Sequence, residues 1–405
     1  MSFVSIAFFV FFAVVLLSQI AVRRARARHA LLLVASYVFY GWWDWRFCGL
    51  MLFLTAVAYL AGLGMEKRPG RRWILAVGVA VPLLVLFYFK YMNFFVGAFC
   101  AAFGVRRAGA LRIILPVGIS FYTFQSLSYT IDVYRGKLRA SRDPLKFALY
   151  IAFFPQLVAG PIVKAAEFLP QLEEERGPTA RRVFRGLTEL FYGMFKKAVL
   201  ADRMAVFADS VFGAVGAYSS ATVALAVAAY AMQIYFDFSG YSDMAAGAAR
   251  CLGYDLPINF NRPYVARNIS QFWKRWHISL SSWLQRYLYI PLGGNRRGAA
   301  RTYLNLMITM TLGGLWHGAD WTFVAWGALH GLALCAHKLW AKRFPPKPGA
   351  WRRGVSTALT VAFVCLMWVF FRAENMDHAL LIFRRLFAFA PGASNLSSWT
   401  LIAMA

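Results

Sequence analysis

Long apolar runs separated by short basic segments dominate the sequence. Windows close to the length of a membrane-spanning helix, about 17–25 residues, predict spans near 2–21, 30–42, 47–64, 73–91, 113–131, 145–163, 186–201, 222–238, 303–316, 320–340 and 355–371. Between Asn93 and Arg112 a shorter apolar piece leaves open whether the chain re-enters, lies flat or crosses. The pattern predicts an all-α, polytopic membrane protein with about eleven or more transmembrane or re-entrant helices.

The stretch 233–317 departs from this pattern, because its hydropathy falls while its aromatic content stays high. The block 272–283 suits an amphipathic helix that lies in the membrane interface or packs inside the protein. Irregular backbone at membrane depth is stable only where protein or a water-filled cavity satisfies its polar groups. The sequence therefore predicts a central polar funnel within a single membrane domain over residues 1–405.

Composition excludes a soluble globular protein. Hydrophobic residues make up 60% of the chain and charged residues 15%, against roughly 45–50% and about 25% in soluble domains. The 44 Lys and Arg against 17 Asp and Glu give a net charge of +27, which in a soluble chain would indicate nucleic acid. Because the basic residues cluster between apolar runs, they fit the positive-inside rule instead. We expect contact with membrane lipids and none with nucleic acid.

Two histidines are the strongest candidates for chemistry. His317 lies between two apolar spans and beside glycines, where an ionisable residue usually faces a cavity or a partner. Imidazole titrates near neutral pH and can act as general base and general acid. His277 shares a helical face with Lys274 and Ser281 if 272–283 is one helix, and it would orient the acceptor, bind the donor or act jointly with His317. The alternative for both is a packed, hydrogen-bonded histidine.

Other polar residues are candidates for binding. Asp237 and Asp243 are six positions apart and do not share a helical face, so each either binds substrate or anchors the fold by pairing with Lys or Arg. Lys274 and Arg275, with Arg296 and Arg297, are candidates to bind a phosphate of the donor or of a lipid, or they form a solvated face. His330 and His337 share a face but lack further ligands at metal-binding spacing, which favours packing and no metal site.

Six blocks of the sequence resemble one family in order and in detail. They are 115–125, 154–162, 235–243, 272–283, 289–295 and 315–321. These blocks resemble the membrane-bound O-acyltransferase family, and within it the alginate O-acetylase branch. Chains of that branch continue through further apolar spans beyond the block 370–374, so the resemblance predicts that this sequence is truncated at its C-terminal end.

The resemblance implies a multi-pass enzyme of the bacterial inner membrane that moves an acyl group from a thioester to a hydroxyl. His317 matches the catalytic histidine of the family and His277 its second functional histidine. The implied donor is acetyl-CoA or another acyl thioester, with no bound cofactor. The implied acceptor is an exopolysaccharide such as alginate, reached directly or through periplasmic acetyltransferase partners. Asn295, Trp316 and Trp321 lie in matching blocks and are candidates to bind substrate or stabilise an oxyanion.

Two other functions remain open at this stage. One is D-alanyl transfer from an acyl carrier protein to teichoic acid, which the same two histidines would serve. The other is a transporter or flippase in which Asp237, His277 and His317 line a substrate path. The Trp-His-Gly block together with a second histidine block, and without paired discontinuous helices at repeated positions, favours the acyltransferase.

Overall fold

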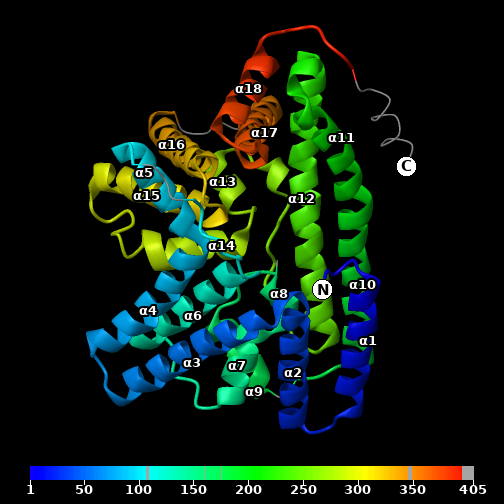
Figure 1. Cartoon of the computed structure of the whole chain (residues 1–405), viewed down its shortest axis with the longest axis vertical. Coiled ribbons are helices and arrows are strands. Elements are labelled where there is room, and N and C mark those ends of the chain that lie inside the picture. Colours follow the sequence, from blue (N-terminus) through cyan, green and yellow to red (C-terminus); the bar gives the residue numbers. More distant parts are fainter. Residues whose placement is uncertain (106–108, 159, 175, 345–348, 395–405) are drawn as a thin grey trace. The chain divides into compact units, whose positions relative to one another are not determined.

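The computed structural model describes residues 1–105, 109–158, 160–174, 176–344 and 349–394 (Figure 1). These residues form helices and loops with no strand, and one isolated bridge joins Tyr218 to Ala393. The prediction of an all-α protein is therefore confirmed. Contacts group the chain into two compact units, which we call unit 1 (Met1–Met194 with Tyr241–Ile258) and unit 2 (Phe195–Gly240 with the chain from Asn259 onward).

Unit 1 contains most of the N-terminal helices. They are α1 (Ile6–Ala21), α2 (Ala25–Asp44), α3 (Arg46–Lys67), α4 (Arg72–Leu86), η1 (Phe87–Tyr91), α5 (Met92–Phe103), α6 (Ile119–Tyr134), α7 (Pro144–Ala152), α8 (Phe154–Leu157), α9 (Ala165–Glu173) and α10 (Ala180–Phe195). Helix α6 lies against both α3 and α4 (Figure 1), and most of its side chains are buried.

The structure defines two segments of unit 1, one that the sequence left open and one that it predicted as a single helix. The apolar piece after Asn93 continues the preceding helix, because α4, η1 and α5 form one helical run from Arg72 to Phe103. The window 145–163 is not one helix. It divides into α7 and α8 at Phe153, whose ψ of 107° is extended, and Pro155 occupies the first turn of α8, where a missing N–H is tolerated.

Within the part of the chain that the structure describes, four helical runs are long and apolar enough to cross a membrane. They are Arg46–Lys67, Arg72–Phe103, Ser220–Cys251 and Ala350–Arg372. Their length and composition match the roughly 20 apolar residues that a bilayer requires. The chain is thus a membrane protein, as the composition predicts.

Unit 2 carries the segment that the sequence singled out. Its elements are η2 (Lys196–Ala201), α11 (Asp202–Gly213), η3 (Val215–Ala217), the first part of α12 (Ser220–Cys251), η4 (Pro263–Val265), α13 (Ile269–Trp273), α14 (Ile278–Leu284), η5 (Gln285–Tyr289), α15 (Gly298–His317), α16 (Trp321–Arg343), α17 (Ala350–Arg372) and α18 (Met376–Phe387). Buried tryptophans form its centre, with Trp276 and Trp326 both packed against Trp368.

Helices α15 and α16 form a hairpin whose turn determines where His317 lies. They lie side by side (Figure 1), joined by residues 318–320. Asp320 caps the N-terminus of α16, and its carboxylate accepts a hydrogen bond from the Thr322 N–H at 2.8 Å. A Cβ on Gly314 would overlap the Phe323 carbonyl oxygen and lie 3.0 Å from the Cα of Gly327. Glycine at 314 therefore allows the two backbones to approach closely, as small residues do between membrane helices.

Candidate active site

His277 breaks the segment that the sequence predicted as one amphipathic helix. Helix α13 ends at Trp273 and α14 begins at Ile278, and His277 between them has φ +45° and ψ +55°. The Ile278 N–H donates to the Asn259 carbonyl oxygen at 2.9 Å, and the Asn261 N–H donates to the Arg275 carbonyl oxygen at 2.9 Å. The prediction of a single helix over 272–283 is therefore wrong. Hydrogen bonds from a distant segment replace the local ones, and Lys274 does not share a helical face with His277.

The left-handed backbone of His277 is costly for a residue other than glycine. Such a conformation raises the free energy by about 1–2 kcal/mol and persists only where the surroundings enforce it, often at functional sites. Only three residues other than glycine have positive φ in the described part of the chain, namely Arg262, His277 and Phe389. The strain marks the turn at His277 as a position that the rest of unit 2 holds in place.

The structure brings together the two histidines that the sequence singled out. His317 is the last residue of α15 and is partly exposed, whereas His277 is 1% exposed. Their ring centroids are 6.2 Å apart. The indole of Trp316 contacts both, with centroid distances of 6.0 Å to His277 and 5.0 Å to His317. One imidazole is thus reachable from outside the protein and the other lies directly behind it.

Aromatic side chains enclose the histidine pair. Phe238 of α12 meets the His277 ring edge-on at 4.7 Å. Trp326 of α16 and Phe371 of α17 lie 5.3 and 5.1 Å from the His317 ring. The rings exclude water from the buried imidazole, and burial lowers the pKa of His277. His277 is therefore neutral near pH 7, the form in which an imidazole accepts a proton.

Asn259 is a polar neighbour of this pair that sequence reasoning missed. Its side-chain oxygen lies 3.1 Å from His277 Nδ1, and it also accepts from the N–H and the hydroxyl of Ser279, at 3.2 and 3.0 Å. Asn259 is 3% exposed. In the sequence it stands within the polar, aromatic stretch 233–317, and no spacing rule connects it with a histidine eighteen residues later.

Asp237 is ion-paired in the structure. Its carboxylate contacts the Lys197 ammonium of η2, which also binds the Asp202 carboxylate at 2.7 Å. The sequence offered this pairing as the alternative to substrate binding. The contact with Lys197 favours the structural role, since it holds α12 to the segment that precedes α11. Asp243 lies on the part of α12 that belongs to unit 1.

The remaining candidates are mostly exposed or make hydrogen bonds with other residues. Lys274, Arg296 and Arg297 are exposed, and the Arg275 guanidinium donates to the Asn261 carbonyl oxygen at 3.2 Å. The exposed Asn295 accepts from the Tyr289 hydroxyl and from Lys338. Trp321 begins α16 and is 56% exposed. Among these binding candidates, Trp316 is the one whose described contacts include both histidines.

Comparison with known proteins decides the family. The model of the membrane-bound O-acyltransferase family matches residues 30–376, which include both histidines and their aromatic neighbours. The chain belongs to the membrane-bound O-acyltransferase family. It is therefore an O-acyltransferase, and its histidine pair lies within the family domain.

Three relatives illustrate its place in that family. The chain is 44% identical over 385 residues to a protein named "Probable alginate O-acetylase AlgI" of Azotobacter vinelandii, covering 93% of this chain and 74% of the relative. It is 38% identical over 389 residues to a "Peptidoglycan O-acetyltransferase" of Helicobacter pylori, covering 87% and 72%. It is 25% identical over 282 residues to a "Teichoic acid D-alanyltransferase" of Bacillus subtilis, covering 66% and 71%.

His330 is a buried histidine of this O-acyltransferase that lies outside the pair. It is fully buried among the rings of Phe272, Trp273, Trp326 and Phe363. The prediction of a packing role agrees with this position. Among the described residues, no group of three His, Cys, Asp or Glu is arranged to hold a metal ion.

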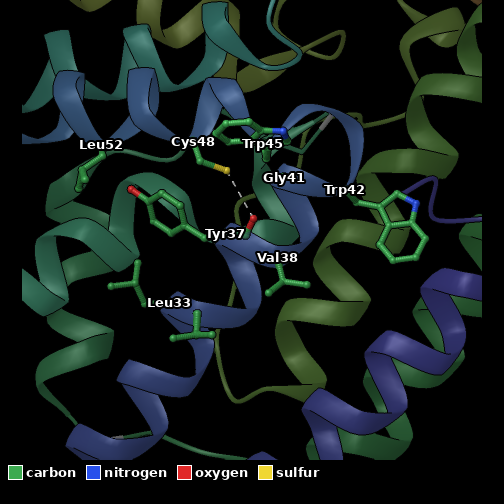
Figure 2. Close-up of a pocket in the computed structure, with 9 residues that line it drawn as sticks. Leu33, Tyr37, Val38, Gly41, Trp42, Trp45, Cys48 and Leu52 are labelled. Carbon is green, nitrogen blue, oxygen red and sulfur yellow. Dashed lines mark hydrogen bonds between the residues drawn. The ribbon is translucent and has the colours of Figure 1, made fainter.

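A wide groove of this acyltransferase is lined by residues of unit 1 alone. It is an open groove along α2 and α3 with a volume of about 740 Å³. Figure 2 shows its lining, which includes Leu33, Tyr37, Val38 and Leu52. The Cys48 thiol donates to the Tyr37 carbonyl oxygen at 3.7 Å. The lining is almost entirely apolar. It offers no general base for acyl transfer.

Proposed function

We propose that this acyltransferase moves an acetyl group from a cytoplasmic thioester, acetyl-CoA, through the membrane to a hydroxyl of an exopolysaccharide such as alginate. The transfer occurs directly or through periplasmic partner proteins, and the enzyme is a multi-pass protein of the bacterial inner membrane. The observation that carries the proposal is the pairing of His317 with buried His277, 6.2 Å apart between aromatic walls. The names of the relatives, alginate O-acetylase and peptidoglycan O-acetyltransferase, favour acetyl and a cell-surface polymer.

In the proposed reaction, His317 acts as the general base. Its imidazole takes the proton of the accepting hydroxyl while that oxygen attacks the thioester carbonyl carbon. A carbon–oxygen bond forms and the carbon–sulfur bond breaks. The departing thiolate takes up the proton, so that the products are an acetyl ester and free thiol. Because a thioester is already reactive, holding the two substrates together and supplying one base accounts for much of the rate.

The surroundings of His317 provide the remaining groups that the reaction requires. The negative charge that develops on the carbonyl oxygen calls for a fixed hydrogen-bond donor. We assign this role to the indole N–H of Trp316, whose ring contacts both imidazoles. Asn295 and Trp321 remain candidates for substrate contacts nearer the surface. His277 lies behind the reacting atoms and helps to position donor or acceptor.

Cations that are not already paired with a carboxylate are the best ligands for the phosphates of the donor. Between Asp255 and Asp320 the sequence has no Asp or Glu, yet this stretch carries Lys274, Arg296 and Arg297, all exposed. Charge-assisted hydrogen bonds to phosphate are among the stronger polar contacts in proteins. We therefore propose that these residues and Arg275 bind the nucleotide part of acetyl-CoA.

Neutralising this surface should weaken the binding of acetyl-CoA without slowing the chemistry. We expect Lys274→Ala combined with Arg296→Ala to raise KM for acetyl-CoA about tenfold, which corresponds to about 1.4 kcal/mol, with kcat changed less than twofold. Acetyl-pantetheine, which lacks the phosphates, should show the same KM with both proteins. Arg352→Ala, an exposed cation at the start of α17, is the matched control. An equal rise in KM for both donors would contradict the assignment.

The arrangement of the membrane spans is also part of the proposal. The four long apolar runs are joined by shorter or more polar helices, of which α15 and α16 carry the histidine site. We propose that these complete a set of about eleven spanning or re-entrant helices around a central polar funnel. The funnel would let a hydroxyl from the far side and a thioester from the cytoplasm meet at His317.

One alternative reaction has an observation in its favour. The 25% identity to a teichoic acid D-alanyltransferase extends over 282 residues, and a histidine base would serve D-alanyl transfer equally well. The identity to the O-acetylases is higher and covers more of this chain. Supplying acetyl-CoA and a D-alanyl carrier protein side by side to the purified enzyme distinguishes the two, because only one thioester should be consumed.

A further inference from the structure

The turn at His277 is held by one asparagine from a distant segment, and this arrangement has a chemical consequence. We propose that Asn259 is a positioning residue that fixes His277 as the imidazole protonated on Nδ1, so that Nε2 is the nitrogen that accepts a hydrogen bond and positions donor or acceptor. The inference rests on the proposed function, because it assumes that His277 takes part in acyl transfer. It adds which nitrogen of His277 acts and which residue determines that choice.

The orientation of the Asn259 amide follows from its partners. The backbone N–H of Ser279 can only donate, and it lies 3.2 Å from the side-chain oxygen of Asn259. The Ser279 hydroxyl donates to the same oxygen at 3.0 Å. The group that faces His277 is therefore an oxygen, which can only accept. Since it lies 3.1 Å from Nδ1, Nδ1 must carry the hydrogen.

The other ring nitrogen then has its lone pair available. His277 Nε2 is buried and has no hydrogen-bond partner among the described residues. A neutral imidazole carries one ring hydrogen, so a hydrogen on Nδ1 leaves Nε2 as an acceptor. The ring with this lone pair lies next to His317 and Trp316. A ring of the opposite tautomer would present an N–H at this position and could not accept a hydrogen bond there.

Asn259 holds the backbone of the turn as well as the ring. Its carbonyl oxygen accepts from the Ile278 N–H at 2.9 Å, so main chain and side chain of one residue bind the three consecutive residues 277–279. Asn259 and Ser279 are 3% and 5% exposed. The left-handed backbone of His277 is thus tied to the residue that orients its ring. This is the kind of support that keeps a reactive group in one geometry.

Few charged groups face the His277 ring. Phe238, Phe260 and Trp316 contact it and carry no charge, and His317 is the one titratable side chain in ring contact among the described residues. On its own segment, Lys274 is exposed and Arg275 binds a carbonyl oxygen. Asn259 orients the imidazole without adding a negative charge, so His277 stays neutral. A carboxylate at position 259 would orient the ring equally well but would stabilise its charged form.

Two substitutions of Asn259 separate orientation from packing. Asn259→Leu removes the acceptor, so we expect kcat to fall about 30–300-fold while KM for acetyl-CoA changes less than threefold, because a small misplacement of a positioning group costs on the order of 10²-fold. Asn259→Asp keeps the acceptor at nearly the same size. We expect it to retain at least a tenth of the activity at its pH optimum and to move the acid limb of kcat to higher pH by a unit or more. The sign follows because His277 must be neutral for Nε2 to accept a hydrogen bond, and a carboxylate beside the ring raises its pKa.

The experiment uses the full chain in detergent or vesicles, with acetyl-CoA as donor and melting temperature as the check on folding. Asn261→Ala, an exposed asparagine two residues away, is the matched control and should leave kcat unchanged. The inference is overturned if Asn259→Leu keeps kcat within threefold of the parent while His277→Ala is inactive. It is also overturned if Asn259→Asp is as impaired as Asn259→Leu with an unshifted acid limb. A fully active His277→Ala would instead refute the use of His277 in the proposed function.

Discussion

Replacing His317 by alanine is expected to lower polysaccharide acetylation by a factor of about 10³ while the protein still inserts in the membrane. General acid–base catalysis contributes typically 10²–10⁴-fold, and His317 is the partly exposed member of the pair. His317 is the last residue of α15, and the helix that follows, α16, is capped by Asp320. The loss should therefore appear in kcat and little in the melting temperature. The measurement is the acetyl content of polymer from cells that lack any other acetylase.

The matched control for this prediction is His337→Ala. His337 lies on α16 and is partly exposed, outside the aromatic enclosure of the pair. Its substitution should leave acetylation within twofold of the parent. The double variant His277→Ala with His317→Ala should be no worse than His317→Ala by more than a few fold, because residues that act as a unit show strongly non-additive effects. If His317→Ala keeps more than a tenth of the parental acetylation, His317 is not the general base.

Substituting Gly314 should have the largest effect on the fold. A Cβ at this position would overlap the Phe323 carbonyl oxygen and crowd the Gly327 backbone, and backbone atoms cannot rotate away as a flexible side chain can. Overpacking costs typically 1–3 kcal/mol and sometimes more. We expect Gly314→Leu to lower the melting temperature by about 5 °C or more and to abolish activity, because His317 lies one turn further along α15.

A second glycine supplies the control for this prediction. Gly354 lies in α17 with no atom within 4 Å of the place where its Cβ would be. Alanine there should leave the melting temperature unchanged or raise it, because glycine inside a helix is less favourable than alanine by about 0.5–1 kcal/mol. Gly314→Ala should lie between the two. If Gly314→Leu melts with the parent protein, close packing of α15 on α16 is not what positions His317.

The sequence predicted those features that depend on local pattern. Helices occur close to most of the predicted spans, because apolar runs of this length form helices wherever backbone groups must be satisfied internally. The pattern also singled out His317 and His277, because an ionisable group in an apolar segment is costly and usually has a function. The packing role of His330 was predicted as well, because no further ligand stands at metal-binding spacing beside it.

The features that the sequence could not predict depend on contacts between distant residues. Residues 272–283 have a helical pattern, yet hydrogen bonds from Asn259 and Asn261 break the helix at His277. The same contacts place Asn259 at the imidazole, which no spacing rule indicates. The sequence shows glycines beside His317. Only the short distance between Gly314 and Gly327 shows that this glycine allows a second helix to pack closely.

Transfer of labelled acetyl across a sealed membrane would test whether this enzyme carries acetyl from a thioester on one side to a polymer on the other with His317 as its base. The purified protein is placed in vesicles with [¹⁴C]acetyl-CoA on one side and polysaccharide, with its periplasmic partners, on the other. We expect the amount of free CoA thiol on the donor side to rise together with the amount of label in the polymer, and we expect His317→Ala to abolish both. Movement of sugar or acetyl-CoA across the membrane without release of thiol, and unchanged in His317→Ala, would contradict this expectation and identify a transporter.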